Sequence, residues 1–152
     1  MVTLVLALFV CCVTLSAQKF AIFSDVHVTP GNANEAKLKA AVAEVNKSDV
    51  DYVIVSGDLT NEGSDEQLRN VNSIFDAFTK PYYIIPGNHE NNWSQSACKT
   101  FNDLWGADRF VFTVGDLVVL GMNCGPFMKM GDGHITVSYT HLRAHETLMN
   151  LV

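Results

Sequence analysis

The sequence predicts an α/β fold in which short strands alternate with amphipathic helices. Three apolar runs of strand length, FAIF, YVIV and YYII, are separated by two segments whose apolar residues recur at helical spacing. Strands that are joined through helices pair in parallel by right-handed crossovers. With 152 residues and 48% hydrophobic content, the chain is long enough and apolar enough for one packed domain.

Apolar spacing predicts the first strand and the first helix. Residues 20–23 form a continuous apolar run, which is typical of a strand buried on both faces. Residues 35–46 are expected to be helical, because their apolar side chains fall on one helical face: Leu38, Ala41, Val42 and Val45. A second strand begins at Tyr52 and is rich in β-branched residues.

The second helix is predicted to begin at Ser64, which forms a capping-box pattern with Gln67. A third strand, YYII, follows this helix and ends before Pro86. Further along, RFVFTVGDLVVLGMN predicts two antiparallel strands with a turn at Gly115 and Asp116, added to the same sheet. The expected apolar stripe of the second helix consists of Leu68, Val71, Ile74, Phe75 and Phe78.

Polar side chains follow each of the three predicted parallel strands. The carboxyl ends of such strands meet at one edge of a sheet, where ligands bind in open α/β folds. Glycines at 57 and 87 allow the backbone to turn sharply beside these side chains. The candidate site residues are Asp25 and His27 after the first strand, Asp58 after the second, and Asn88 and His89 after the third.

These side chains indicate a pair of divalent metal ions. Carboxylate, imidazole and amide oxygen suit Mn, Fe, Zn or Mg. Asp25 and His27 are two residues apart, so in extended backbone both would point to the same side. Asp58 could bridge two ions roughly 3.5–4 Å apart, which together can activate a water for phosphoryl transfer. A simpler interpretation is that these residues cap helices and close turns.

The pattern SDVH…SGDLTNEG…PGNHE resembles the calcineurin-like metallophosphoesterase family, from Phe20 to about Asn123. The resemblance implies a four-layer α/β/β/α sandwich with mixed sheets, of which the C-terminal half is missing here. It also implies a hydrolase of phosphate esters, a phosphodiesterase or phosphomonoesterase, whose nucleophile is a metal-bound water or hydroxide.

The resemblance assigns a role to each candidate. Asp25 and His27 would bind the first metal, Asp58 would bridge, and Asn88 would bind the second. His89 would lie near the substrate as the catalytic residue, protonating the leaving group or steadying the transition state. The expected partner is a phosphate-ester substrate; a net charge of −6 and the lack of a Lys/Arg run indicate no nucleic-acid surface.

The sequence departs from the family pattern in two ways. A further His and a later GHxH-like motif do not follow, and His134 in GDGH is assigned to a loop instead. Asn61 stands where purple acid phosphatases place a Tyr, so the spacing is more similar to exported phosphodiesterases of the cyclic-nucleotide type. A non-catalytic binding or scaffold domain with the same fold is the alternative function.

Residues 1–17 are expected to be a signal peptide, cleaved after Ala17. The protein would then be secreted or periplasmic, with no stable membrane anchor after cleavage. A buried N-terminal strand or helix is the alternative, and a lipoprotein anchor at Cys11 is less favoured. Export would permit Cys98 and Cys124 to pair, but two spare thiols in the core are equally compatible with the sequence.

The C-terminal segment VSYTHLRAHET matches the translation of a common transposase sequencing adapter. Residues 137–152 are therefore expected to be an artefact, which leaves residues 18–136 as a partial metallophosphoesterase domain. His141 and His145 stand four apart and could imitate a metal pair on a helix, but the adapter origin argues against that interpretation.

Overall fold

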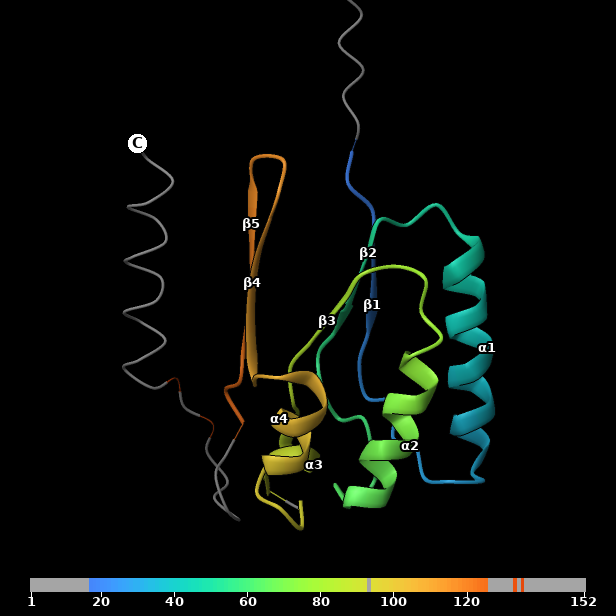
Figure 1. Cartoon of the computed structure of the whole chain (residues 1–152), viewed down its shortest axis with the longest axis vertical. Coiled ribbons are helices and arrows are strands. Elements are labelled where there is room, and N and C mark those ends of the chain that lie inside the picture. Colours follow the sequence, from blue (N-terminus) through green and yellow to red (C-terminus); the bar gives the residue numbers. More distant parts are fainter. Residues whose placement is uncertain (1–16, 93, 126–132, 134, 136–152) are drawn as a thin grey trace, which may run out of the picture.

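The computed structural model describes residues 17–92, 94–125, 133 and 135. The expected signal peptide up to residue 16, His134, and the segment with His141 and His145 lie outside the described residues. Within them the chain forms these elements in order (Figure 1): β1 Phe20–Phe23, α1 Ala33–Lys47, β2 Tyr52–Val55, α2 Asp65–Phe75, β3 Tyr82–Ile84, α3 Asn88–Asn92, α4 Lys99–Trp105, β4 Arg109–Val114 and β5 Leu117–Met122.

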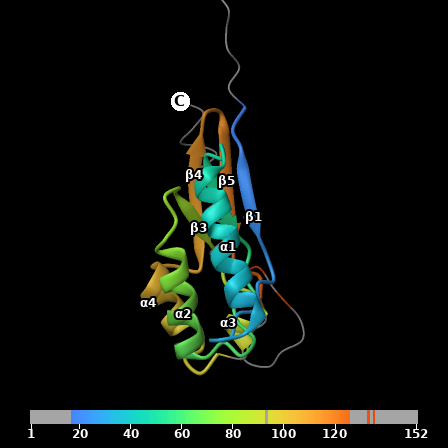
Figure 2. The ribbon, with the colours of Figure 1, turned by 90° about the vertical axis from the view of Figure 1, so that its right-hand side faces the viewer.

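The first half of the chain is the predicted βαβαβ unit. Strands β1, β2 and β3 lie side by side in that order and pair in parallel, with Phe20 opposite Tyr52 and Val53 opposite Tyr82. Helices α1 and α2 cover one face of this sheet, and the β4–β5 hairpin lies on the other side (Figures 1 and 2). The α/β class is therefore confirmed.

The main core lies between the parallel sheet and the two helices. Val53 and Val55 on the central strand are fully buried, and Leu68 and Phe75 of α2 are buried against them. Each apolar side chain of this size stabilises the fold by about 1.5–3 kcal/mol when fully buried. This layer fixes the strands whose carboxyl ends carry the polar residues.

Both long helices begin at side-chain caps. Asn32 accepts a hydrogen bond from the Glu35 amide at 2.9 Å, so α1 begins two residues before the predicted position. Ser64 accepts from the Gln67 amide at 3.3 Å, as the sequence predicts. The Gln67 side chain accepts from the Glu62 amide at 3.0 Å instead of closing a reciprocal box with Ser64.

The β4–β5 hairpin corrects one prediction. Its strands pair antiparallel and turn at Gly115, where φ is +57°, but they form a separate two-stranded sheet and do not extend the parallel one. Phe112 instead stacks on Tyr83, with ring centroids 3.7 Å apart. Burial of aromatic area between two faces thus prevails over pairing at the sheet edge. The resulting stack of helices, sheet and hairpin agrees with the layers that the resemblance implies.

Two further features follow from burial. Cys98 and Cys124 are both free thiols. Cys98 is buried as a core thiol, but Cys124 is exposed, so the expectation of two core thiols is wrong for Cys124. Burial raises the pKa of the Cys98 thiol to about 12, and the nearby Asp108 and Glu90 act in the same direction.

Among the described residues, helices that are both long and apolar enough to cross a bilayer are absent.

Candidate metal centre

The loops that follow β1 and β2 run side by side at the carboxyl end of the sheet. Backbone amides of Asp25 and His27 donate to the carbonyls of Gly57 and Asp58 at 3.2 and 3.1 Å. One residue further on, Val28 forms a parallel bridge with Thr60. The predicted site residues of these two strands are therefore held together by the main chain.

The backbone at three candidate residues is left-handed. Asp25, His27 and Asp58 have φ values of +53°, +46° and +50°. Non-glycine residues rarely adopt this conformation, and where it persists it often marks a functional site. The prediction of extended backbone at Asp25 and His27 is therefore wrong, because their amides bond to the β2 loop. Their side chains nevertheless approach, with His27 Nε2 3.9 Å from Asp25 Oδ1.

The loops after β2 and β3 meet through two glycines. A Cβ atom on Gly57 would lie 2.3 Å from the Gly87 nitrogen, and one on Gly87 would lie 2.1 Å from Asp58 Oδ1. Side chains at these positions would force the two loops apart. Gly57 also has a φ of +94°. The glycines serve close backbone approach in addition to the turn that the sequence predicts.

His27, Asp58 and His89 form the tightest group of donors. One ligand atom from each lies within 4.8 Å of the others, which is close enough for a single metal ion. The rings of His27 and His89 meet edge to face, with centroids 4.7 Å apart. His89 comes from the first turn of α3, a short helix that the sequence analysis did not predict.

A hydrogen bond orients the His89 ring. Its Nδ1 lies 2.7 Å from the carbonyl oxygen of Asn61. A carbonyl only accepts, so Nδ1 carries the hydrogen and the lone pair of the neutral ring is on Nε2. Such a backbone partner is typical of imidazoles that bind metal or transfer protons.

Asn88 and Asp25 flank this group. With its nitrogen turned toward Asp58, the Asn88 amide donates to Oδ1 and Oδ2 at 3.2 and 3.1 Å. With its oxygen turned there, as a metal ligand requires, it would face only acceptors, an arrangement that a cation stabilises. The Asp25 side chain is 65% exposed and accepts a hydrogen bond from the Ser24 hydroxyl.

The donor set fits divalent metal. Two carboxylates, two imidazoles and one amide oxygen gather where three loops meet, and oxygen and nitrogen donors of this kind hold Mn, Fe, Zn or Mg. His27, Asp58 and His89 could share one ion, with Asp25 beside His27 and Asn88 beside Asp58. His89 thus lies among the possible ligands, a role that the sequence analysis did not assign to it.

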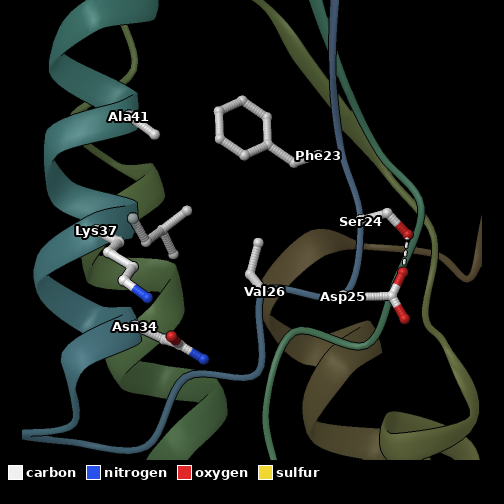
Figure 3. Close-up of a pocket in the computed structure, with 8 residues that line it drawn as sticks. Phe23, Ser24, Asp25, Val26, Asn34, Lys37 and Ala41 are labelled. Carbon is white, nitrogen blue, oxygen red and sulfur yellow. Dashed lines mark hydrogen bonds between the residues drawn. The ribbon is translucent and has the colours of Figure 1, made fainter.

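A cavity of about 250 Å³ lies next to the site, between the end of β1 and helix α1. Figure 3 shows Lys37 and Asn34 on the helix side, whereas the Asp25 carboxylate points away from them. Asp25 is among the residues that line this cavity, so the cavity borders the candidate metal centre.

Glu90 is the residue that the sequence analysis missed. It directly follows His89, yet it is fully buried. Burial raises the pKa of its carboxyl, whereas hydrogen bonds from Gly87 and Thr60 act in the opposite direction. In the sequence, Glu90 is an acidic residue directly after the candidate residues Asn88 and His89. This position by itself does not distinguish a metal ligand from a residue that holds the ligands in place.

Comparison with known proteins indicates a family of phosphoesterases. A sequence profile described as calcineurin-like phosphoesterase matches residues 18–151. A protein of Rhodopseudomonas palustris named as a probable cyclic nucleotide phosphodiesterase is 31% identical over 81 residues, covering 48% of this chain and 30% of its own. One of Vesicomyosocius okutanii with the same description is 27% identical over 105 residues, covering 66% and 43%.

A glycerophosphodiester phosphodiesterase of Enterobacter lignolyticus is 30% identical over 77 residues, covering 49% of this chain and 26% of its own. The chain thus spans less than half the length of each of these curated relatives. The similarity lies with phosphodiesterases in all three cases.

Proposed function

This chain belongs to the calcineurin-like phosphoesterase family, and we propose that it forms part of a metal-dependent phosphodiesterase. The observation that carries the proposal is the meeting of His27, Asp58 and His89 donor atoms within 4.8 Å at the ends of three separate chain segments. Relatives named as cyclic-nucleotide and glycerophosphodiester phosphodiesterases favour a diester over a monoester as substrate.

We propose that the site binds two divalent metal ions. Asp25 and His27 would hold the first, Asp58 would lie between the two, and Asn88 would hold the second. When bound, such ions supply Lewis acidity toward the phosphoryl oxygens and lower the pKa of a water that acts as nucleophile.

We propose that His89 donates a proton to the leaving group. Its Nδ1–H is held by the Asn61 carbonyl, so a second proton can only be taken up and given back at Nε2. The Asp58 carboxylate accepts from the His89 amide at 3.2 Å and so holds this residue beside the proposed site. In this role Nε2 carries a proton and is not a metal ligand, and its N–H would donate to the leaving oxygen or to a phosphoryl oxygen.

The boundaries of the active protein are also proposals. Residues 1–17 are proposed as a cleaved export signal, which would make the protein secreted or periplasmic. Residues 18–136 are proposed as the N-terminal part of the domain, with 137–152 of adapter origin. Further ligands would then come from sequence that relatives contain beyond the matched region. The 152-residue chain is accordingly expected to bind metal weakly and to turn over poorly.

The test compares this chain with the protein translated from the uninterrupted reading frame. The longer protein should hydrolyse bis(p-nitrophenyl) phosphate with added Mn²⁺, and chelation should abolish the activity. Asp58→Ala should abolish it as well, whereas Asp103→Ala, at a carboxylate 53% exposed on α4, should not. Turnover that persists after chelation would exclude the proposal.

A non-catalytic binding domain is the second candidate. It would be indicated by Mn²⁺ binding that depends on Asp58 without hydrolysis of diesters or monoesters by the longer protein.

A further inference from the structure

Glu90 is a fully buried acidic residue in the middle of the site loops. Its carboxylate accepts four hydrogen bonds. Oε1 accepts from the amides of Leu59 and Thr60 at 3.0 and 3.2 Å and from the Thr60 hydroxyl at 3.2 Å. Oε2 accepts from the Gly87 amide at 2.9 Å. Both oxygens are thus committed to the protein itself.

The four donors belong to two different loops. Leu59 and Thr60 directly follow Asp58, and Gly87 directly precedes Asn88. The Glu90 carboxylate therefore connects the residues that follow Asp58 with the residue that precedes Asn88. Because these loops have left the sheet, their amides need partners that neighbouring strands do not supply. Hydrogen bonds to a charged acceptor are also stronger than those between neutral groups.

Helix α3 holds Gly87 from both sides. Glu90 accepts from the Gly87 amide, and the Asn91 side chain donates to the Gly87 carbonyl at 3.0 Å. Asn91 is in turn paired with Asn123 at the end of β5, at 2.7 and 3.0 Å in the two directions. The peptide before Asn88 is therefore fixed by buried polar groups that cannot themselves touch substrate.

We infer that Glu90 is a positioning residue, which sets the separation of Asp58 from Asn88 and His89 and thereby the affinity of the centre for divalent metal. The inference rests on the proposed function. The inference differs from the proposed function because it assigns no contact between Glu90 and metal or substrate.

An amide cannot replace this carboxylate. Glutamine has nearly the same shape, but it offers one acceptor oxygen and one NH₂ group. In either orientation, at least one backbone amide of Leu59, Thr60 or Gly87 would face another donor. Glu90→Gln should therefore loosen the junction of the loops with little change in volume.

The experiment measures Mn²⁺ affinity and diesterase kinetics on the protein from the uninterrupted reading frame. Glu90→Gln is compared with Glu44→Gln, a control at a glutamate 75% exposed on α1. Loss of a supporting partner typically weakens metal binding by about 10–100-fold, so Mn²⁺ affinity should fall at least about 10-fold in Glu90→Gln and be unchanged in Glu44→Gln. Activity should recover toward the parent value as Mn²⁺ is raised.

A second pair of variants covers the case in which Glu90→Gln fails to fold. Thr60→Val removes one donor to Glu90, and Thr60→Ser keeps the hydroxyl as its control. Thr60→Val should weaken Mn²⁺ binding in the same direction but less, and Thr60→Ser should not. Amide exchange at Leu59 and Gly87 in the metal-free variants should become faster wherever Mn²⁺ affinity falls.

The outcomes separate the inference from the proposed function. If the parent binds Mn²⁺ and hydrolyses diesters, and Glu90→Gln or Thr60→Val lowers only thermal stability, Glu90 is a structural residue and the inference is wrong. If the parent binds Mn²⁺ without hydrolysis and Glu90→Gln weakens that binding, the inference stands and the phosphodiesterase proposal fails. A parent that binds no divalent metal overturns both, and the amide exchange then reports loop packing alone.

Discussion

The two sides of the candidate metal centre are built differently. On one side, the loops after β2 and β3 meet at Gly57 and Gly87 and are joined by the buried carboxylate of Glu90. On the other, Asp25 is held by its backbone, while its side chain is 65% exposed. Within the described residues, strand β1 lies at one edge of the sheet and pairs with β2 alone, whereas β2 pairs with both β1 and β3.

This difference indicates which part of the site is preorganised. The Asp58 carboxylate is surrounded by groups from α3 that are already in place, so metal binding need not order them. Ile22 on β1 is 70% exposed, which shows that the β1 side of the sheet is uncovered within the described residues. The β2–β3 side should therefore respond most strongly to substitution.

The largest effect is expected from Gly87→Ala. Its new Cβ would lie 2.3 Å from the Asp58 nitrogen as well as against the Asp58 side chain, so backbone must move. Such overpacking costs about 1–3 kcal/mol or more, and here it also displaces a proposed metal ligand. We expect a lower unfolding midpoint together with loss of Mn²⁺ binding.

Gly31→Ala is the matched control for that substitution. Gly31 has a φ of +82° and no atom within 4 Å of the new Cβ, so it carries backbone strain of about 1–2 kcal/mol without a clash. Its Mn²⁺ affinity should stay at the parent value. Equal Mn²⁺ affinity in Gly87→Ala and Gly31→Ala would contradict the close-approach argument.

The next effect compares the two carboxylates directly. Asp58→Asn changes a member of the three-residue donor group, and Asp25→Asn leaves that group complete. Titration with Mn²⁺ should show a loss larger than about 100-fold for Asp58→Asn, beyond the range for supporting partners. Asp25→Asn should show a smaller loss. The reverse order would mean that the exposed β1 side dominates binding.

The smallest effect is a difference in thiol reactivity. Cys98 lies on the α3 side, where burial raises its pKa to about 12, and Cys124 is exposed. Thiolate is the reactive form, so iodoacetamide at pH 8 should modify Cys124 and leave Cys98 intact. Peptide mass spectrometry gives the two extents, and both should rise to the same level in denaturant.

The same pKa determines a dependence of stability on pH. Because the folded pKa of Cys98 lies above the ordinary value of 9.0, the unfolded state loses its proton first. The contribution is fully present below pH 9 and is lost as pH rises toward 12. Cys98→Ser should reduce this alkaline slope, and an unchanged slope would place its origin in other groups.

Local patterns predicted much of the fold. Apolar spacing located β1, α1, β2, α2 and β3, and Ser64 marked the start of α2, because these features depend on residues near one another in the chain. The hairpin turn at Gly115 was found for the same reason. Helix α3 was missed, since the polar run from Asn88 carries turn residues and no apolar stripe. Helix α4 was missed although Phe101, Leu104 and Trp105 recur at helical spacing within it.

The sequence by itself determined that five polar residues follow three strands of a parallel sheet, since alternation of strands and helices with right-handed crossovers implies parallel pairing. These residues are Asp25, His27, Asp58, Asn88 and His89. Tertiary structure decided how they face one another. The left-handed backbone at Asp25, His27 and Asp58 arises from hydrogen bonds to a neighbouring loop. The burial of Glu90 depends on donors about 30 residues away. Contacts between distant segments exist only after folding, so no local pattern encodes them.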